Sequence, residues 1–180
     1  MRLSRKHSLV LLGIASVAFF VALSVIERRL SEEGGPSIVE FEFVASAARA
    51  TQMLAEWGSD GRELARLSLW VDFGFMASYG AFVALAAVAT RDFGRDRGLR
   101  RLAAAGVVVP ALAISAALFD AAENTALLLI LGGHGGAAAP PLATVCASVK
   151  FLLITLSIGY VLWGLVSRFR AGPSRPGVVG

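Results

Sequence analysis

The chain has 180 residues, of which 56% are hydrophobic and 17% are charged. With a mean hydropathy of +0.69, this composition excludes an ordinary soluble domain and indicates a protein that lies in lipid. The net charge of +4 does not indicate nucleic-acid binding, because the basic residues flank apolar runs instead of covering a soluble face. They are interpreted here as topology signals and contacts with anionic lipid.

The first apolar run covers about residues 8–26 and follows Arg2, Arg5 and Lys6. Such a run is either a cleaved signal peptide or a retained helix. We favour the retained helix, because the run is long for the apolar part of a signal peptide. In addition, residues 27–29 offer no small-residue cleavage site.

A polar segment, residues 27–66, follows and is interrupted by Gly34, Gly35 and Pro36. A new helix is expected to begin at Ser37. Apolar residues recur at near-helical spacing over residues 37–57, although the alternation around Phe41 would also suit a strand. We predict an amphipathic helix at the membrane surface.

The other three membrane-spanning runs are predicted at about residues 67–90, 102–131 and 142–166. The third contains Pro110 and is longer than a bilayer requires, so tilt or a kink is expected near that residue. Residues 1–170 are predicted to form one transmembrane domain, and residues 171–180 a disordered cytoplasmic tail.

The flanking charges give one consistent topology. The loop at residues 91–101 carries five arginines and two aspartates, and arginines also follow the fourth run. By the positive-inside rule both termini and this loop are cytoplasmic, and residues 27–66 and 132–141 are extracytoplasmic. The predicted fold is all-α: a polytopic transmembrane antiparallel four-helix bundle with an outer-face amphipathic segment.

Inside the apolar runs stand only four ionisable residues: Asp72, Asp120, Glu123 and Lys150. At a rise of 1.5 Å per residue they lie roughly 9 to 18 Å from the outer helix ends, with Asn124 at about 12 Å. They are therefore expected to meet, because an isolated charge inside a bilayer costs about 2.5 to 3.5 kcal/mol even on the most lenient scale.

Helix periodicity supports this expectation. Asp120, Glu123 and Asn124 share one helix face, and Asp72 shares a stripe with Tyr79. Three carboxylates against one lysine leave an excess negative charge, which a raised carboxylate pKa, a metal ion or a cationic ligand would resolve. The sequence does not choose among these, so the metal and the cofactor stay unknown.

Two interpretations of the charged residues remain open. One is a buried network that fixes helix register. The other, which we favour because structural networks seldom carry unbalanced charge, is an intramembrane site open to the outer face. There a carboxylate would accept a proton or bind a cation, and Lys150 would pair with an anionic group.

No motif in the sequence names a common catalytic class. Walker, zinc-protease, serine-hydrolase, dinucleotide-binding and Cys-x-x-Cys motifs do not occur. The single cysteine, Cys146, has no metal-ligand spacing with His7 or His134.

Several short motifs run from Glu40 to Gly58, from Leu69 to Gly80 and from Asp120 to Asn124, and end at Lys150 and Phe151. Together they resemble the motifs of an uncharacterised group of small bacterial four-helix integral membrane proteins. The resemblance implies that Asp72, Tyr79, Asp120, Glu123, Asn124 and Lys150 act as one unit, but it implies no substrate.

The function expected from the sequence is that of a multi-pass protein of the bacterial inner membrane acting on a lipid or small amphiphile. Asp72, Asp120, Glu123 and Lys150 are the candidate catalytic residues, and Tyr79 and Asn124 the candidate ligand-binding residues. The alternative is a non-enzymatic carrier or accessory subunit, in which the charges bind a cation or proton or lock the bundle. The bilayer is the expected partner and nucleic acid is not; a homodimer is left open.

Overall fold

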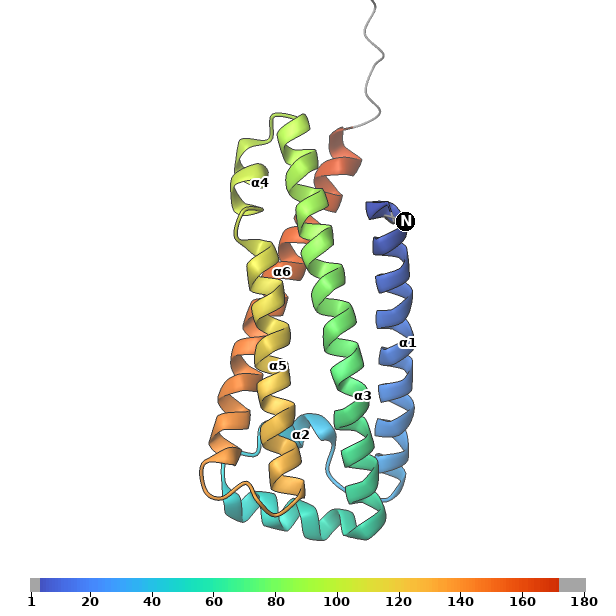
Figure 1. Ribbon diagram of the computed structural model, residues 1–180, viewed down its shortest axis with the longest axis vertical. Coiled ribbons are helices and arrows are strands. Elements are labelled where there is room, and N and C mark those ends of the chain that lie inside the picture. The colour runs from blue at the N-terminus through green and yellow to red at the C-terminus, as the bar shows by residue number, and fades with distance from the viewer. Residues whose placement is uncertain (1–3, 172–180) are drawn as a thin grey trace, which may run out of the picture.

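The computed structural model describes residues 4–171, and this part of the chain contains helices and no strand (Figure 1). The predicted tail at residues 171–180 lies outside the described residues except for its first position. The helices are α1 (Arg5–Glu32), α2 (Ile38–Glu42), α3 (Ala47–Asp96), α4 (Arg100–Ala105), α5 (Val109–Leu131) and α6 (Ala139–Ala171).

Four helical stretches within residues 4–171 are long and apolar enough to cross a membrane: Arg5–Glu32, Ala47–Asp96, Arg100–Leu131 and Ala139–Arg170. The all-α fold class and the number of long apolar helices predicted from the sequence are therefore confirmed. Each stretch is longer than its predicted run; in the first two, polar residues at both ends continue the same helix.

The prediction of one amphipathic helix over residues 37–57 is wrong. Ser37 and Glu40 form a capping box that starts α2, but this helix ends at Glu42. Residues 43–46 are not helical, and the Ser46 side chain accepts a hydrogen bond from the Arg49 backbone N–H to start α3. Two helix starts nine residues apart thus divide the segment.

α3 consists of two parts that meet at Gly58. This residue has φ 62° and ψ −157°, a conformation that is open to glycine and strongly disfavoured for other residues. The part before Gly58 lies across the lower end of the molecule in Figure 1, and the part after it turns upward beside α1. The chain therefore changes direction at Gly58, between the transverse first part of α3 and its long apolar second part.

The long helices lie side by side and define two ends (Figure 1). We call the upper end, which carries the start of α1, the α3–α4 connection and the end of α6, the arginine-rich end. The lower end, which carries α2, the first part of α3 and the α5–α6 loop, is the α2 end. α1 packs chiefly against α3, whereas α6 packs against α5 and α3.

The third predicted span is interrupted between α4 and α5, at residues 106–108, just before Pro110. Proline lacks the N–H that a continuous helix would need and is suited to the first turn of a new one. The Tyr160 hydroxyl donates a hydrogen bond of 3.0 Å to the Leu102 carbonyl oxygen and so holds α4 against α6.

The larger hydrophobic core lies at the α2 end. Phe41 of α2 is fully buried, and its ring meets that of Trp57 edge-on at a centroid distance of 4.9 Å. The Trp57 indole N–H donates a hydrogen bond of 2.7 Å to the Pro36 carbonyl oxygen. These contacts fix α2 and the transverse part of α3 over the ends of the long helices.

Candidate binding site: a buried charged cluster beside a cavity

The Lys150 ammonium group is the centre of a buried charged cluster. Its Nζ lies 2.9 Å from Asp120 Oδ1, 3.0 Å from Glu123 Oε1 and 3.3 Å from Glu42 Oε2. The Lys150 side chain is 7% exposed, and the three carboxylate side chains range from 0% to 11%. The cluster therefore joins α2, α5 and α6 through ion pairs that are largely screened from solvent.

The remaining predicted residues adjoin this cluster. The Tyr79 hydroxyl donates a hydrogen bond of 2.8 Å to Asp120 Oδ2. Asn124 Nδ2 donates to Asp72 Oδ2 at 2.8 Å and to the Leu69 carbonyl oxygen at 3.3 Å. The structure thus brings together all six residues named from the sequence, although Asp72 reaches the others through Asn124 and not through Lys150.

Sequence reasoning missed Glu42 as a member of the cluster. It was assigned to the extracytoplasmic segment because it stands outside the apolar runs. In the structure α2 starts at its capping box and buries both Phe41 and Glu42. Burial raises the pKa of the Glu42 carboxyl above its ordinary value, and the nearby Lys150 ammonium opposes that rise.

Glu42 increases the charge imbalance of the site. Four carboxylates, those of Glu42, Asp72, Asp120 and Glu123, now face one ammonium group, which leaves a formal charge of −3 if all are ionised. Such a charge is costly away from water, and bound protons or a positively charged ligand would reduce it.

Several buried acceptor atoms in the cluster receive no hydrogen bond from any side chain or backbone group of residues 4–171. They are Glu123 Oε2, Asn124 Oδ1 and Glu42 Oε2, although the last is within ion-pair distance of Lys150. An unsatisfied buried polar atom costs about 1 to 3 kcal/mol, so a proton on one of the carboxylates or a donor from elsewhere would stabilise these atoms.

A cavity of about 460 Å³ lies beside the cluster. Asp72, Asp120, Asn124 and Lys150 form its polar side, and Glu42 lines it from α2. The rest of the wall is mainly apolar and aromatic and comes from α1, α2, α3 and α6: Phe20, Leu23, Ile38, Val39, Leu69, Phe75, Tyr79, Val83, Phe151, Ile154 and Ile158. A polar site beside a large apolar wall is typical of small-molecule pockets.

The cavity has an open side between α1 and α6. Both helices line it, but α1 packs chiefly against α3. The lining side chains Phe20, Phe151 and Ile158 remain 58%, 41% and 44% exposed, respectively. The opening is therefore bordered by apolar side chains and lies along the flank of the helices, not only at their ends.

No ready-made metal site is found within the described part of the chain. No three His, Cys, Asp or Glu side chains between residues 4 and 171 are arranged to hold a metal ion. The three carboxylates of Glu42, Asp120 and Glu123 converge on the Lys150 ammonium, which takes the position that a cation would otherwise have.

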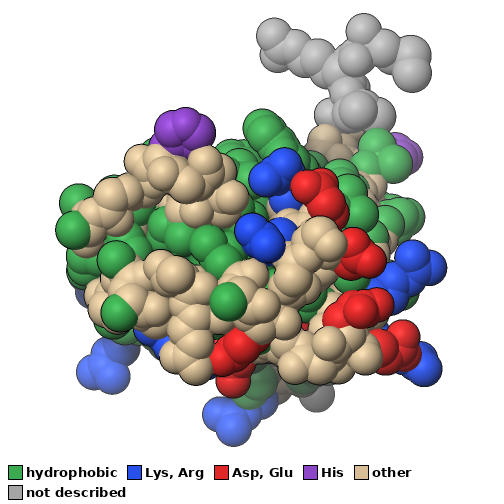
Figure 2. All heavy atoms as spheres, turned by 90° about the horizontal axis from the view of Figure 1, so that it is seen from below, with side chains coloured by type: hydrophobic (Ala, Val, Ile, Leu, Met, Phe, Trp, Pro, Cys, Tyr) green, Lys and Arg blue, Asp and Glu red, His purple; other side chains and the backbone are tan. Residues whose placement is uncertain are grey.

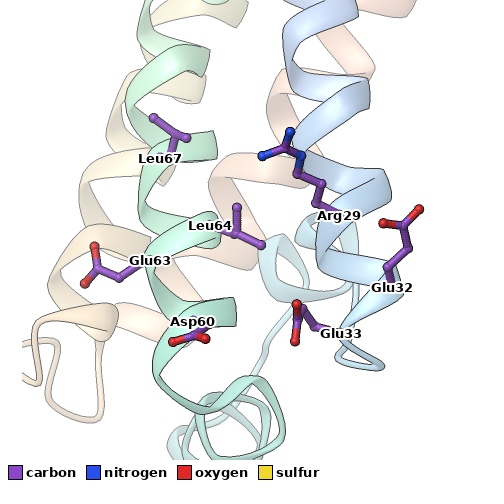
Figure 3. A pocket seen from close by; sticks show the side chains of 7 residues that line it. All are labelled: Arg29, Glu32, Glu33, Asp60, Glu63, Leu64 and Leu67. Atoms are coloured by element: carbon purple, nitrogen blue, oxygen red, sulfur yellow. The ribbon is translucent and has the colours of Figure 1, made fainter.

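A second hollow lies at the α2 end, between the end of α1 and α3 just after Gly58. We call it the acidic groove; it is lined by Arg29, Glu32, Glu33, Asp60, Glu63, Leu64 and Leu67. Figure 2 shows acidic side chains gathered on this side of the α2 end. In Figure 3, Arg29 and Leu64 point into the space between the helices, whereas Glu32 and Glu63 point away from it.

Comparison with known protein families, with curated proteins and with solved structures finds no match to this chain. The chemistry of the cluster and the cavity is therefore the basis for assigning a function.

Proposed function

We propose that the chain is a multi-pass protein of the bacterial inner membrane, folded as an antiparallel four-helix bundle with its arginine-rich end in the cytoplasm. The positive-inside rule supports this orientation, because residues 91–101 carry five arginines and the end of α6 carries Arg168 and Arg170. The acidic groove lies at the opposite end. In this orientation the cavity opens within the half of the bilayer nearer the outer surface.

Within the membrane, we propose a binding site for a lipid or small amphiphile. The observation that supports it is the cavity itself, whose apolar wall leads to buried charges and whose flank opens between α1 and α6. An amphiphile entering sideways from the bilayer would place its chain along the wall and its head group at the cluster.

The geometry favours Asp72 as the group that exchanges a proton with the bound molecule. Asp72 is only half-buried and lines the cavity, whereas Glu123 is fully buried and lies behind it. Both oxygens of Asp120 already have partners, in Lys150 and Tyr79. We therefore assign Asp120 and Glu123 to positioning Lys150, although the sequence made both of them candidate catalytic residues.

A non-enzymatic role is the second candidate, in which the cluster locks the bundle or binds a cation or proton. The observation that favours it is that Lys150 is fully engaged by three carboxylates from α2 and α5. Those ion pairs join elements that are far apart in the sequence.

Orientation is tested by a topology reporter fused after Arg97, in the α3–α4 connection. Cytoplasmic reporter activity is expected. Periplasmic activity at this position would contradict the orientation and, with it, the placement of the cavity in the outer half.

Amphiphile binding is tested by closing the cavity with Ser24→Trp. Ser24 lines the cavity from α1 and is not in the charged cluster. The matched control is Ser148→Trp on α6, since both serines are exposed and donate to the carbonyl four residues earlier, at 2.8 Å. Native mass spectrometry of the protein in nanodiscs should show lost amphiphile binding for Ser24→Trp only. Equal binding by both variants would refute the cavity as the site.

A further inference from the structure

The polar side of the cavity is rich in hydrogen-bond acceptors. Asn124 uses its Nδ2 donors on Asp72 and the Leu69 carbonyl, while its Oδ1 receives no donor from the described chain. Exchanging the amide oxygen and nitrogen would place two acceptors against a third, so the assignment follows from the chemistry of its neighbours. Asn124 is 0% exposed and still lines the cavity.

Glu42 and Asp72 extend this acceptor surface. Both line the cavity, and Glu42 Oε2 forms an ion pair with Lys150 Nζ at 3.3 Å. Lys150, the cationic residue in the lining of this cavity, already has three carboxylate partners. A negatively charged head group would therefore meet excess negative charge with no free positive group to balance it.

The aromatic part of the wall also suits a cation. Phe20, Phe75, Tyr79 and Phe151 line the cavity, and the faces of aromatic rings attract cations when water is excluded. Lys150 Nζ lies 5.0 Å from the centre of the Phe151 ring, so one wall residue already accepts an ammonium group in this way.

From these observations we infer that the ligand is an amphiphile whose head group is a hydrogen-bond-donating ammonium, such as a primary alkylamine, held by Glu42, Asp72 and the Asn124 side-chain oxygen. This inference rests on the proposed amphiphile site and names the chemical class that it takes. The ligand's positive charge offsets the excess carboxylates, and its N–H groups supply a donor to Asn124 Oδ1, which receives none from the described residues.

The chemical class of the ligand's head group is tested with four probes that share a decyl chain and differ in the head group: decylammonium, decyltrimethylammonium, decanol and decanoate. Each is titrated into the full-length wild-type protein in nanodiscs, below its micellar concentration, with binding read by native mass spectrometry. Decylammonium should bind about tenfold or more tightly than decyltrimethylammonium, the scale of one hydrogen bond to a charged group. Decanol and decanoate should bind more weakly still.

Asp72→Asn should weaken decylammonium binding at least tenfold on the same scale. Glu63→Gln is the matched control, because it removes a carboxylate from the exposed acidic groove and should leave the affinity unchanged. Equal losses in the two variants would indicate general electrostatic attraction and overturn the inference.

The wild-type probe series is decisive even where a variant fails to fold. Decanol or decanoate binding as tightly as decylammonium, or equal binding of the primary and quaternary amines, would overturn the ammonium inference and leave an amphiphile site in place. If no probe binds, or if Ser24→Trp leaves every affinity unchanged, the proposed function itself fails.

Discussion

The charged cluster and the acidic groove each contain four acidic side chains and one basic side chain, but the cluster is buried and the groove is exposed. The basic residue of the cluster is Lys150, and its acidic residues are Glu42, Asp72, Asp120 and Glu123. The basic residue that lines the groove is Arg29, and its acidic residues are Glu32, Glu33, Asp60 and Glu63. In the groove, Glu32 and Glu63 pair with the neighbouring Arg28 and Arg66 along their own helices, with side chains 43% to 82% exposed. In the cluster no side chain of the Lys150 ion pairs exceeds 11%.

The same kinds of charged group affect stability differently in the two regions because the cluster is buried and the groove is exposed to water. In the groove, water solvates each carboxylate, and exposed ion pairs contribute only about 0 to 1 kcal/mol. In the cluster, charges and acceptors must be balanced by other groups of the protein or by a ligand. Substitutions in the cluster should therefore change stability more than matched substitutions in the groove, and this difference tests the account.

The largest expected difference comes from removing the single base of each region. Lys150→Met leaves several buried carboxylates without their cation and should destabilise the protein by about 3 to 5 kcal/mol. Arg29→Met removes an exposed cation and should change stability by less than about 0.5 kcal/mol. Thermal unfolding in detergent measures both. A Lys150→Met protein as stable as the wild type but unable to bind amphiphile would exclude a structural role for the network.

A smaller effect is expected at Gly58, where α3 changes direction just before the part that lines the acidic groove. A Cβ there meets no atom within 4 Å, so Gly58→Ala tests the positive φ alone and should cost about 1 to 3 kcal/mol. Gly159→Ala in α6 also enters open space but in a helix without positive φ, and it should be neutral or slightly stabilising. Equal melting temperatures for the two variants would contradict the turn described at Gly58.

The smallest expected effect is a pH dependence at Glu42. Its folded-state pKa is raised, so its contribution is complete below the unfolded value of about 4.3 and declines as the pH rises through the folded value. The wild type should therefore lose more stability than Glu42→Gln on going from pH 5 to pH 8. Glu40→Gln is unsuitable as a control because Glu40 caps α2, so Glu33→Gln serves instead. Parallel pH profiles for wild type and Glu42→Gln would contradict a buried Glu42.

The sequence predicted the helices well because the features that indicate a membrane-spanning helix can be read directly along the chain. A long apolar run with arginines at one end is visible without knowing any contact. The predicted limits were too short because helices continue through polar residues such as those that follow Thr90 and precede Leu67.

The site was only partly predictable, for a different reason. Asp120, Glu123 and Lys150 were visible because a charge inside an apolar run is rare. Glu42 stands in a polar segment, and its burial depends on the capping box of α2 and on the non-helical residues 43–46 that bring α2 into contact with α5 and α6. The Ser37–Glu40 spacing of the capping box was the available signal, but it predicts a helix start and not the direction of a side chain.

The most direct test of the central claim is photocrosslinking of a decyl probe with a diazirine on its chain, followed by peptide mapping, in bilayers containing the full-length protein. The account predicts labels on Phe75 and Val83 of α3 and on Phe151 and Ile154 of α6, all lost in Ser24→Trp. Labels confined to exposed side chains of α1 outside the cavity, such as Val10, Ile14 and Val17, and unchanged by Ser24→Trp, would contradict it.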